Sequence, residues 1–252
     1  MKLTILGSGT GVPSGARNSA GYFAELPDAG VMMDCGAGTV HALARYGLPW
    51  ERMTHLFISH FHVDHVGELA SLFFAFCYGM RSERTEPLTL LGPAGLENII
   101  DGLKSAFGRK VFEPKFPVVV QLLKPGDRVE LGRESSLAVS KTPHTAESLA
   151  VRIENRGRAL GYTGDTGYSE DLVGFFGGAD VLISECSFRE PWPDKRHLSI
   201  AEAARLATRA SVAKLVVTHF YFDVDEAELK AELERGYDGD LVIGRDGLSV
   251  GV

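Results

Sequence analysis

One short segment of the chain, Ser59-His60-Phe61-His62-Val63-Asp64-His65, holds three imidazoles and one carboxylate. His60 and His62 are two residues apart, so in an extended chain both side chains lie on one face. Asp64 and His65 follow at the point where a helical pattern begins. Imidazole and carboxylate groups at this density are more typical of metal ligands than of a solvated loop. The segment therefore predicts a metallohydrolase with ligands for two neighbouring sites, if distant residues complete the shells.

Three later residues could complete these shells, because each directly follows a strand-like run. They are His144, Asp165 and His219. Loops that follow neighbouring strands converge at one edge of a sheet. Taken singly, each residue has a structural explanation, as a turn residue or as a partly buried histidine. Together they carry more weight, because five of the eight histidines lie either in the first segment or at these strand ends.

The elements that must position these residues alternate between strand-like runs and helical patterns. We predict strands at 2–6, 21–26, 31–34, 56–59, 88–91, 118–123, 129–131, 137–142, 149–154, 159–163, 181–185, 215–218, 241–243 and 248–250, and helices at 38–46, 66–80, 96–107, 200–210 and 226–235. No low-complexity or Pro/Ser-rich stretch marks a boundary, so we expect one domain over residues 1–252. Strands inside and helices outside predict an α/β fold with two sheets.

Length and composition agree with one large globular domain, since the chain has 252 residues, 44% of them hydrophobic. The net charge of −7 gives no general attraction for a polyanion. Cys35, Cys77 and Cys186 are odd in number and lie in apolar contexts, which favours a reducing, cytoplasmic location. The apolar run before Gly7 is too short for a signal peptide, and no stretch reaches membrane-spanning length.

The predicted helix 66–80 has one apolar face. Its members recur at steps of three and four residues, namely Leu69, Leu72, Phe73, Phe76, Cys77 and Met80. Phe74 and Tyr78 widen this face, and two explanations are open. We favour a helix buried within the core; the alternative is a helix that also meets a partner subunit in a homodimer.

The order and context of these residues resemble the metal-ligand motifs of the metallo-β-lactamase superfamily, over essentially the whole chain. The resemblance implies a four-layer αββα sandwich with its site at one edge of the sheets. It implies that one metal is bound by His60, His62 and His144, the other by Asp64, His65 and His219, with Asp165 as the bridge. Asp34 resembles the early aspartate that supports the shell from behind, although a helix-capping or turn role would also explain it.

Neutral imidazole and carboxylate ligands suit zinc, the default metal, but also manganese or iron. Two divalent cations about 3.5–4 Å apart can hold a bridging water and lower its pKa toward neutrality. The resemblance therefore predicts a dinuclear hydrolase that uses a bridging hydroxide. We expect Asp64 and Asp165 to orient this nucleophile.

Within the superfamily, the chain is most similar to ribonuclease Z and its short phosphodiesterase relatives. The run Gly7–Pro13 followed by Arg17 and Asn18 resembles a loop near the ribonuclease Z site, so these two residues are candidates for orienting phosphate. This run fails as a dinucleotide fingerprint, because proline and no helix follow it. Ser184-Glu185-Cys186-Ser187 with His197-Leu198-Ser199 resembles a paired motif whose second histidine protonates the leaving oxygen. The family's usual first histidine is Ser184 here.

His197 is therefore our candidate general acid, with Glu185 in support, because a leaving alkoxide needs a proton. His41 and His55 fit surface or packing roles instead. Ser199 and Glu202 form a helix-capping pattern, which is compatible with catalysis because a cap would fix the loop that presents His197.

The expected substrate is a small or single-stranded phosphodiester. His144 and Asp165 are only 21 residues apart, so the long arm that binds tRNA in ribonuclease Z enzymes is missing, and structured tRNA is not expected. Basic residues are scattered rather than clustered. Three alternatives stay open: a thioester, lactone or β-lactam hydrolase on the same site, a tRNA 3′-processing endoribonuclease, and a non-catalytic metal-binding protein. Seven intact ligand positions disfavour the last.

Overall fold

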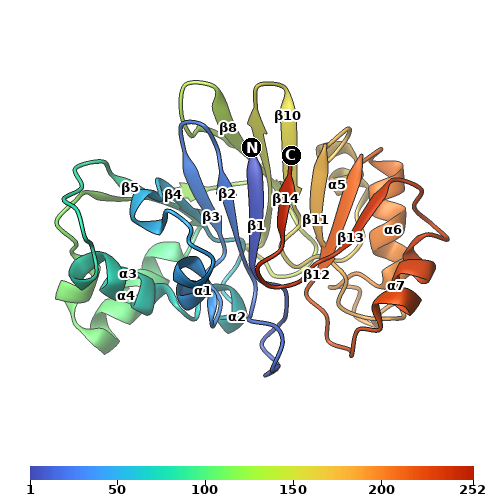
Figure 1. Cartoon of the computed structure of the whole chain (residues 1–252), viewed down its shortest axis with the longest axis horizontal. Coiled ribbons are helices and arrows are strands. Elements are labelled where there is room, and N and C mark those ends of the chain that lie inside the picture. The colour runs from blue at the N-terminus through green and yellow to red at the C-terminus, as the bar shows by residue number, and fades with distance from the viewer.

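The computed structural model describes residues 1–252, and two seven-stranded sheets face one another at its centre (Figure 1). The first sheet contains β1 (Lys2–Gly7), β2 (Gly21–Glu25), β3 (Gly30–Met33), β4 (His55–Phe57), β5 (Leu88–Pro93), β6 (Val118–Leu123) and β14 (Ser249–Gly251). Its order is β14-β1-β2-β3-β4-β5-β6. Pairing is antiparallel from β14 to β3 and parallel from β3 to β6, so β3 and β4 end at the same edge.

The second sheet has a similar plan. It contains β7 (Arg128–Glu130), β8 (Ser135–Lys141), β9 (Leu149–Asn155), β10 (Arg158–Tyr162), β11 (Val181–Glu185), β12 (Lys214–Thr218) and β13 (Asp240–Ile243). Its order is β13-β12-β11-β10-β9-β8-β7, antiparallel from β7 to β10 and parallel from β10 to β13. The parallel strands β10, β11 and β12 therefore end together.

Helices cover the outer face of each sheet. They are α1 (Thr39–Arg45), α2 (Val63–Val66), α3 (Leu69–Tyr78), α4 (Leu96–Phe107), α5 (Glu170–Phe175), α6 (Ile200–Arg209) and α7 (Glu226–Leu233), with short 3-10 turns η1 (Trp50–Arg52) and η2 (Arg109–Phe112). Figure 1 shows α1, α3 and α4 beside the first sheet and α5, α6 and α7 beside the second. The predicted αββα sandwich is confirmed. No helix combines the length and the apolar character that crossing a membrane requires.

Alternation along the strands builds three cores. On β2, Tyr22 and Ala24 point into the core between the two sheets, whereas Phe23 points into the core beneath α1, α3 and α4. A third core lies between the second sheet and α5, α6 and α7. Because successive side chains of a strand point to opposite faces, each central strand contributes to two cores.

Two details of the predicted helix 66–80 were wrong. The helix is divided into α2 and α3 at Gly67 and Glu68, because the backbone N–H of Glu68 donates to Cys35 O and does not continue the helix from α2. Phe74 and Tyr78 do not widen the buried face. They are 55% and 62% exposed, and their rings lie 4.6 Å apart on the outside of α3.

Candidate metal centre

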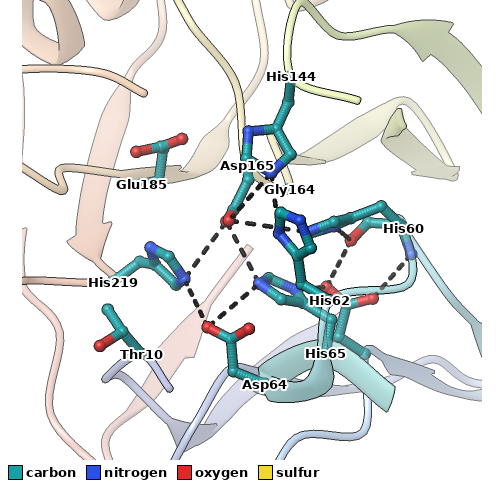
Figure 2. Close-up of polar contacts among 12 residues, drawn as sticks. Thr10, His60, His62, Asp64, His65, His144, Gly164, Asp165, Glu185 and His219 are labelled. Carbon is teal, nitrogen blue, oxygen red and sulfur yellow. Dashed lines mark hydrogen bonds and ion pairs between the residues drawn. The ribbon is translucent and has the colours of Figure 1, made fainter. Parts of the chain in front are cut away.

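Loops at the carboxyl ends of strands bring the predicted ligands together, at the edge of the sandwich where α2 lies (Figure 1). From the first sheet, the segment after β4 supplies His60, His62, Asp64 and His65. From the second sheet, the loops after β8, β10 and β12 supply His144, Asp165 and His219. Figure 2 shows these seven side chains, called the His/Asp cluster below, pointing toward a common centre. The cluster thus spans both sheets.

The cluster contains two ligand groups, and Asp165 lies between them. A third group joins Asp165 and His219 to His197, outside the cluster. His60, His62, His144 and Asp165 place one ligand atom each within 4.8 Å of one another, and so do Asp64, His65 and His219.

The carboxylate of Asp165 faces both groups. Its Oδ2 lies 3.7 Å from both His60 Nε2 and His144 Nε2. Its Oδ1 lies 3.3 Å from His65 Nε2 and 3.4 Å from His219 Nε2. One carboxylate oxygen is thus directed at each group, which is the arrangement a bridging ligand needs.

Several polar atoms in the cluster are buried without a hydrogen-bond partner. They are His60 Nε2, Asp64 Oδ2, His65 Nε2, Asp165 Oδ1 and His219 Nε2. Leaving buried polar atoms unpaired costs free energy, and such groups are rare in folded proteins. Imidazole nitrogens and carboxylate oxygens that converge in this way satisfy a divalent cation. The residues therefore fit a metal site.

Hydrogen bonds outside the cluster fix the tautomer of four histidines. The Nδ1 atoms of His65, His60, His144 and His219 lie 2.7–3.0 Å from Asp34 Oδ2, Ser59 Oγ, Arg196 O and Ser187 Oγ, respectively. Ser59 Oγ donates its own proton to Asp34 and so can accept from His60. Each Nδ1 is therefore placed to donate a proton outward, and each Nε2 faces the cluster. The Nε2 atoms of His60, His65 and His219 have no hydrogen-bond partner, whereas His144 Nε2 lies 3.1 Å from His62 Nδ1.

Asp34 lies behind the cluster, fully buried. It accepts hydrogen bonds from the Ser59 backbone N–H, the Ser59 hydroxyl, His65 and Tyr162. Its φ of 59° lies in the left-handed region, which a non-glycine residue adopts only when its surroundings enforce it. Four donors and the strained backbone together hold the carboxylate against His65.

Burial sets the charge of two histidines in the cluster. It lowers the pKa of His144 to about 4 and the pKa of His60 well below its usual value. Both imidazoles are therefore neutral at pH 7, which is the form that binds metals.

Glu185 and His197 form a pair beside the cluster. Glu185 Oε1 lies 3.0 Å from His197 Nδ1, and the carboxylate also accepts from the backbone N–H groups of Thr166 and Leu198. Burial lowers the pKa of His197, but the hydrogen bond and charge of Glu185 outweigh it and raise this pKa to about 9. The His197 imidazole is thus charged at pH 7, and its Nδ1 lies 4.0 Å from Asp165 Oδ2.

Arg17 and Asn18 do not join the cluster. The Arg17 guanidinium donates to Ser8 Oγ and Gly244 O, and Asn18 Nδ2 donates to Leu6 O. Both side chains therefore hold the loop after β1 in place, and their expected role in orienting phosphate stays a prediction.

Other residues of this loop lie closer to the cluster. A Cβ atom on Gly11 would lie 3.6 Å from Asp64 Cβ, and Figure 2 draws Thr10 on the same side of the cluster as Asp64 and His219. The loop after β1 thus borders the Asp64 side of the site.

Three supporting residues were missed by the sequence analysis. Ser59 and Ser187 each lie within two residues of a predicted site residue, so their position in the chain could have indicated them. The position of Tyr162 in the chain gives no such indication, because it reaches Asp34 only where the two sheets pack face to face.

The family model described as anti-Pycsar protein Apyc1 matches residues 1–236. The probable metallo-hydrolase YhfI of Bacillus subtilis is 27% identical over 98% of both chains, and a ribonuclease Z of Haloarcula marismortui is 26% identical over 98% of this chain and 96% of that protein. The crystal structure of YhfI, a metallo-β-lactamase fold protein, superposes with a TM-score of 0.84 at 26% identity over 99% of both chains. The short form of human tRNase Z superposes with a TM-score of 0.81 at 23% identity, over 100% of this chain and 99% of that one.

Proposed function

This chain belongs to the family of the anti-Pycsar protein Apyc1, and we propose that it is a phosphodiesterase. It is a metal-dependent hydrolase with the metallo-β-lactamase fold. The proposal concerns the bond that it cleaves, a phosphodiester. The observation that carries this proposal is the pair formed by Glu185 and His197 beside the cluster. A charged imidazole held at that place suits a reaction whose leaving group is an alkoxide.

We propose that the cluster holds two divalent metals, zinc by default and manganese or iron as alternatives. One would be held by His60, His62 and His144, the other by Asp64, His65 and His219, with Asp165 between them. Bound there, the metals would supply a nucleophile at neutral pH and stabilise negative charge on the phosphate.

The chain's own residues would perform the remaining steps. His197 would give a proton to the departing oxygen from Nε2, since its Nδ1 is engaged with Glu185. Glu185 would hold the imidazole in one orientation and favour its charged form. Asp64 and Asp165 would orient the nucleophile with their carboxylate oxygens.

We propose a small or single-stranded phosphodiester as the substrate. The relatives named ribonuclease Z support a phosphodiester bond. Between His144 and Asp165 the chain forms only β9, β10 and their turns, so no arm extends from this part of the molecule to clasp a folded tRNA. The net charge of −7 also disfavours a large polyanion.

Hydrolysis of bis(p-nitrophenyl) phosphate by zinc- or manganese-loaded protein tests this proposal. We expect activity in the natural protein and a loss of at least about 100-fold in His62→Ala and Asp165→Asn, because each removes a metal ligand. His41→Ala, a change on α1 outside the cluster, is the matched control and should keep activity. Fully loaded protein that is inert toward every phosphodiester tried would overturn the proposal.

A further inference from the structure

Three aromatic rings stack beside the His/Asp cluster. The Phe188 and Trp192 rings lie 4.3 Å apart at an angle of 15°, and the Phe188 and Tyr221 rings lie 5.4 Å apart at 11°. Phe188 also meets the His197 ring edge to face, at 5.7 Å. The near-parallel rings of Trp192, Phe188 and Tyr221, called the ring stack below, therefore border the proposed proton donor.

Tyr221 is the member of the ring stack that faces the site. Its ring centroid lies 5.6 Å from that of His219 and 6.0 Å from that of His197. Its backbone N–H donates to Ser187 O, which anchors the residue close behind His219. The side chain is nevertheless 42% exposed, so part of the ring is free to contact another molecule.

The exposed part of Tyr221 lines a cavity of ≈ 730 Å³. The cavity lies between residues 9–17, in the loop after β1, and residues 220–224, in the loop after β12. No residue of the His/Asp cluster lines the cavity, but its wall includes Thr10, whose neighbour Gly11 approaches Asp64, and Tyr221, whose ring centroid lies 5.6 Å from that of His219. Its wall also includes the apolar residues Val12, Pro13, Phe220 and Phe222.

Arg17 and Asp223 are the charged residues in the wall of the cavity. Arg17 lines it, but the Nη1 atom of this residue is already bonded to Ser8 and Gly244, and its guanidinium packs 4.9 Å from the Phe220 ring centroid. The exposed ring of Tyr221 and the apolar side chains beside it give a planar apolar ring a surface on which to stack.

We propose that Tyr221, supported by Phe188 and Trp192, is a specificity-determining residue that stacks against a planar aromatic substituent of the substrate. This inference rests on the proposed phosphodiesterase function. A phosphate held at the cluster would lie near His197 and His219, and an aromatic ring a few bonds away from the phosphorus would reach Tyr221. Phe188 and Trp192 would hold the Tyr221 ring in position, which lowers the entropy lost when the substituent binds.

Paired inhibitors test the proposal directly. Phenylphosphonate and methylphosphonate carry the same anionic group, but only the first has an aromatic ring, and neither is hydrolysed. Their affinities for zinc-loaded protein can be measured by calorimetry, and their inhibition constants by competition with bis(p-nitrophenyl) phosphate. We expect the natural protein to bind phenylphosphonate roughly tenfold more tightly than methylphosphonate, as base stacking on aromatic side chains suggests.

The variants separate stacking from a structural role. Tyr221→Ala should bring the affinity ratio close to one without weakening methylphosphonate binding, whereas Tyr221→Phe should keep the ratio because it keeps the ring. Trp192→Ala should reduce the ratio partly. Phe107→Ala, a change in an exposed ring at the end of α4, should leave both affinities unchanged.

Two results would overturn the inference: a ratio near one in the natural protein, or a ratio that Tyr221→Ala leaves intact. Failure of the proposed function is distinguishable from both, because it appears as a lack of phosphodiester hydrolysis, while calorimetry still measures the ratio.

Discussion

The proposed role of His197 sets two requirements, one on its charge and one on its position. As the proposed general acid, it would have to stay charged, and it would have to lie close enough to the phosphate to give its proton to the leaving oxygen. Glu185 meets the first requirement, since its hydrogen bond at 3.0 Å raises the pKa of His197 to about 9. The second would depend on Nε2, and the 4.0 Å distance between His197 Nδ1 and Asp165 Oδ2 shows that the ring lies beside the His/Asp cluster.

Replacement of His197 should therefore depend on the leaving group. We expect His197→Ala to slow cleavage of a dinucleoside monophosphate, which expels an alkoxide, by about 100-fold or more. Bis(p-nitrophenyl) phosphate should be affected far less, because p-nitrophenolate leaves without a proton. Steady-state rates on both substrates measure the difference. Equal rates for variant and natural protein on both, with hydrolysis of thioesters or lactones, would favour the carbonyl alternative instead.

Glu185→Gln should move the pH dependence of the same reaction. An acid works below its pKa, so activity on the alkoxide substrate falls as the pH rises through the pKa of His197. Removal of the Glu185 charge lowers that pKa, and the alkaline decline should move to lower pH. A pH profile of kcat for the variant and the natural protein measures this shift, and identical profiles would contradict it.

His55 should make the folded state sensitive to acid. It is buried on β4, and burial lowers its pKa from 6.5 to about 4. The unfolded chain therefore binds a proton more readily, and stability that is complete above pH 6.5 is lost as the pH falls toward 4. Between pH 7.5 and pH 5 this loss is about 2 kcal/mol. Urea unfolding of His55→Gln should show a correspondingly smaller loss, and an unchanged loss would exclude His55 as its source.

At the scale of elements, the loop after β1 is held by the far end of the chain. Asp246 accepts hydrogen bonds from the Ser8 backbone N–H, the Ser8 hydroxyl and the Asn18 backbone N–H, at 2.7–2.9 Å. Arg17 adds its bond to Gly244 O. These contacts fix the loop that borders Asp64 and forms one wall of the cavity.

Asp246→Ala should release this loop. We expect a loss of about 2 kcal/mol in the free energy of unfolding, because three donors lose a charged acceptor that is only partly exposed. Asp238→Ala, an exposed aspartate outside this contact, is the control and should cost little. Chemical denaturation measures the free energy of unfolding of both variants, and equal losses would show that Asp246 does not hold the loop.

The residues of the His/Asp cluster could be located from the sequence, because the ends of strands can be recognised in it. The runs before His144, Asp165 and His219 end at the loops that form the site, and parallel pairing of β10, β11 and β12 brings those ends together. The sequence could not reveal the division between α2 and α3, because the partner of Glu68 is Cys35, on the loop after β3. Nor could it show that Arg17 bonds to Gly244, since that contact joins opposite ends of the chain.

At the scale of the molecule, the four layers follow from alternation that the sequence displays, since each central strand supplies apolar residues to two cores. The sequence does not show whether the outer surface of a helical layer binds another molecule. Phe74 and Tyr78 are apolar in the helical pattern, yet they face away from the core. The apolar periodicity of a helix cannot distinguish a face that is buried in the core from a face that binds a partner subunit.

The homodimer alternative is therefore still a prediction, and the exposed rings on α3 make it testable. If they form a subunit interface, the natural protein should have twice the mass of one chain by light scattering, and Phe74→Glu should give monomers. Phe107→Glu, which charges an exposed ring on α4, is the control and should leave the mass unchanged. A natural protein that is monomeric at high concentration would rule out this dimer.

Ligands drawn from both sheets have a consequence for how the protein is made. The cluster residues that follow β4 of the first sheet, up to His65, leave the ribosome long before His219, which lies on the loop after β12. Until His219 has emerged and the second sheet has docked, the nascent chain holds an incomplete set of ligands. If the seven residues hold the metals as proposed, a fragment released before His219 is made would lack part of the set and would be inert.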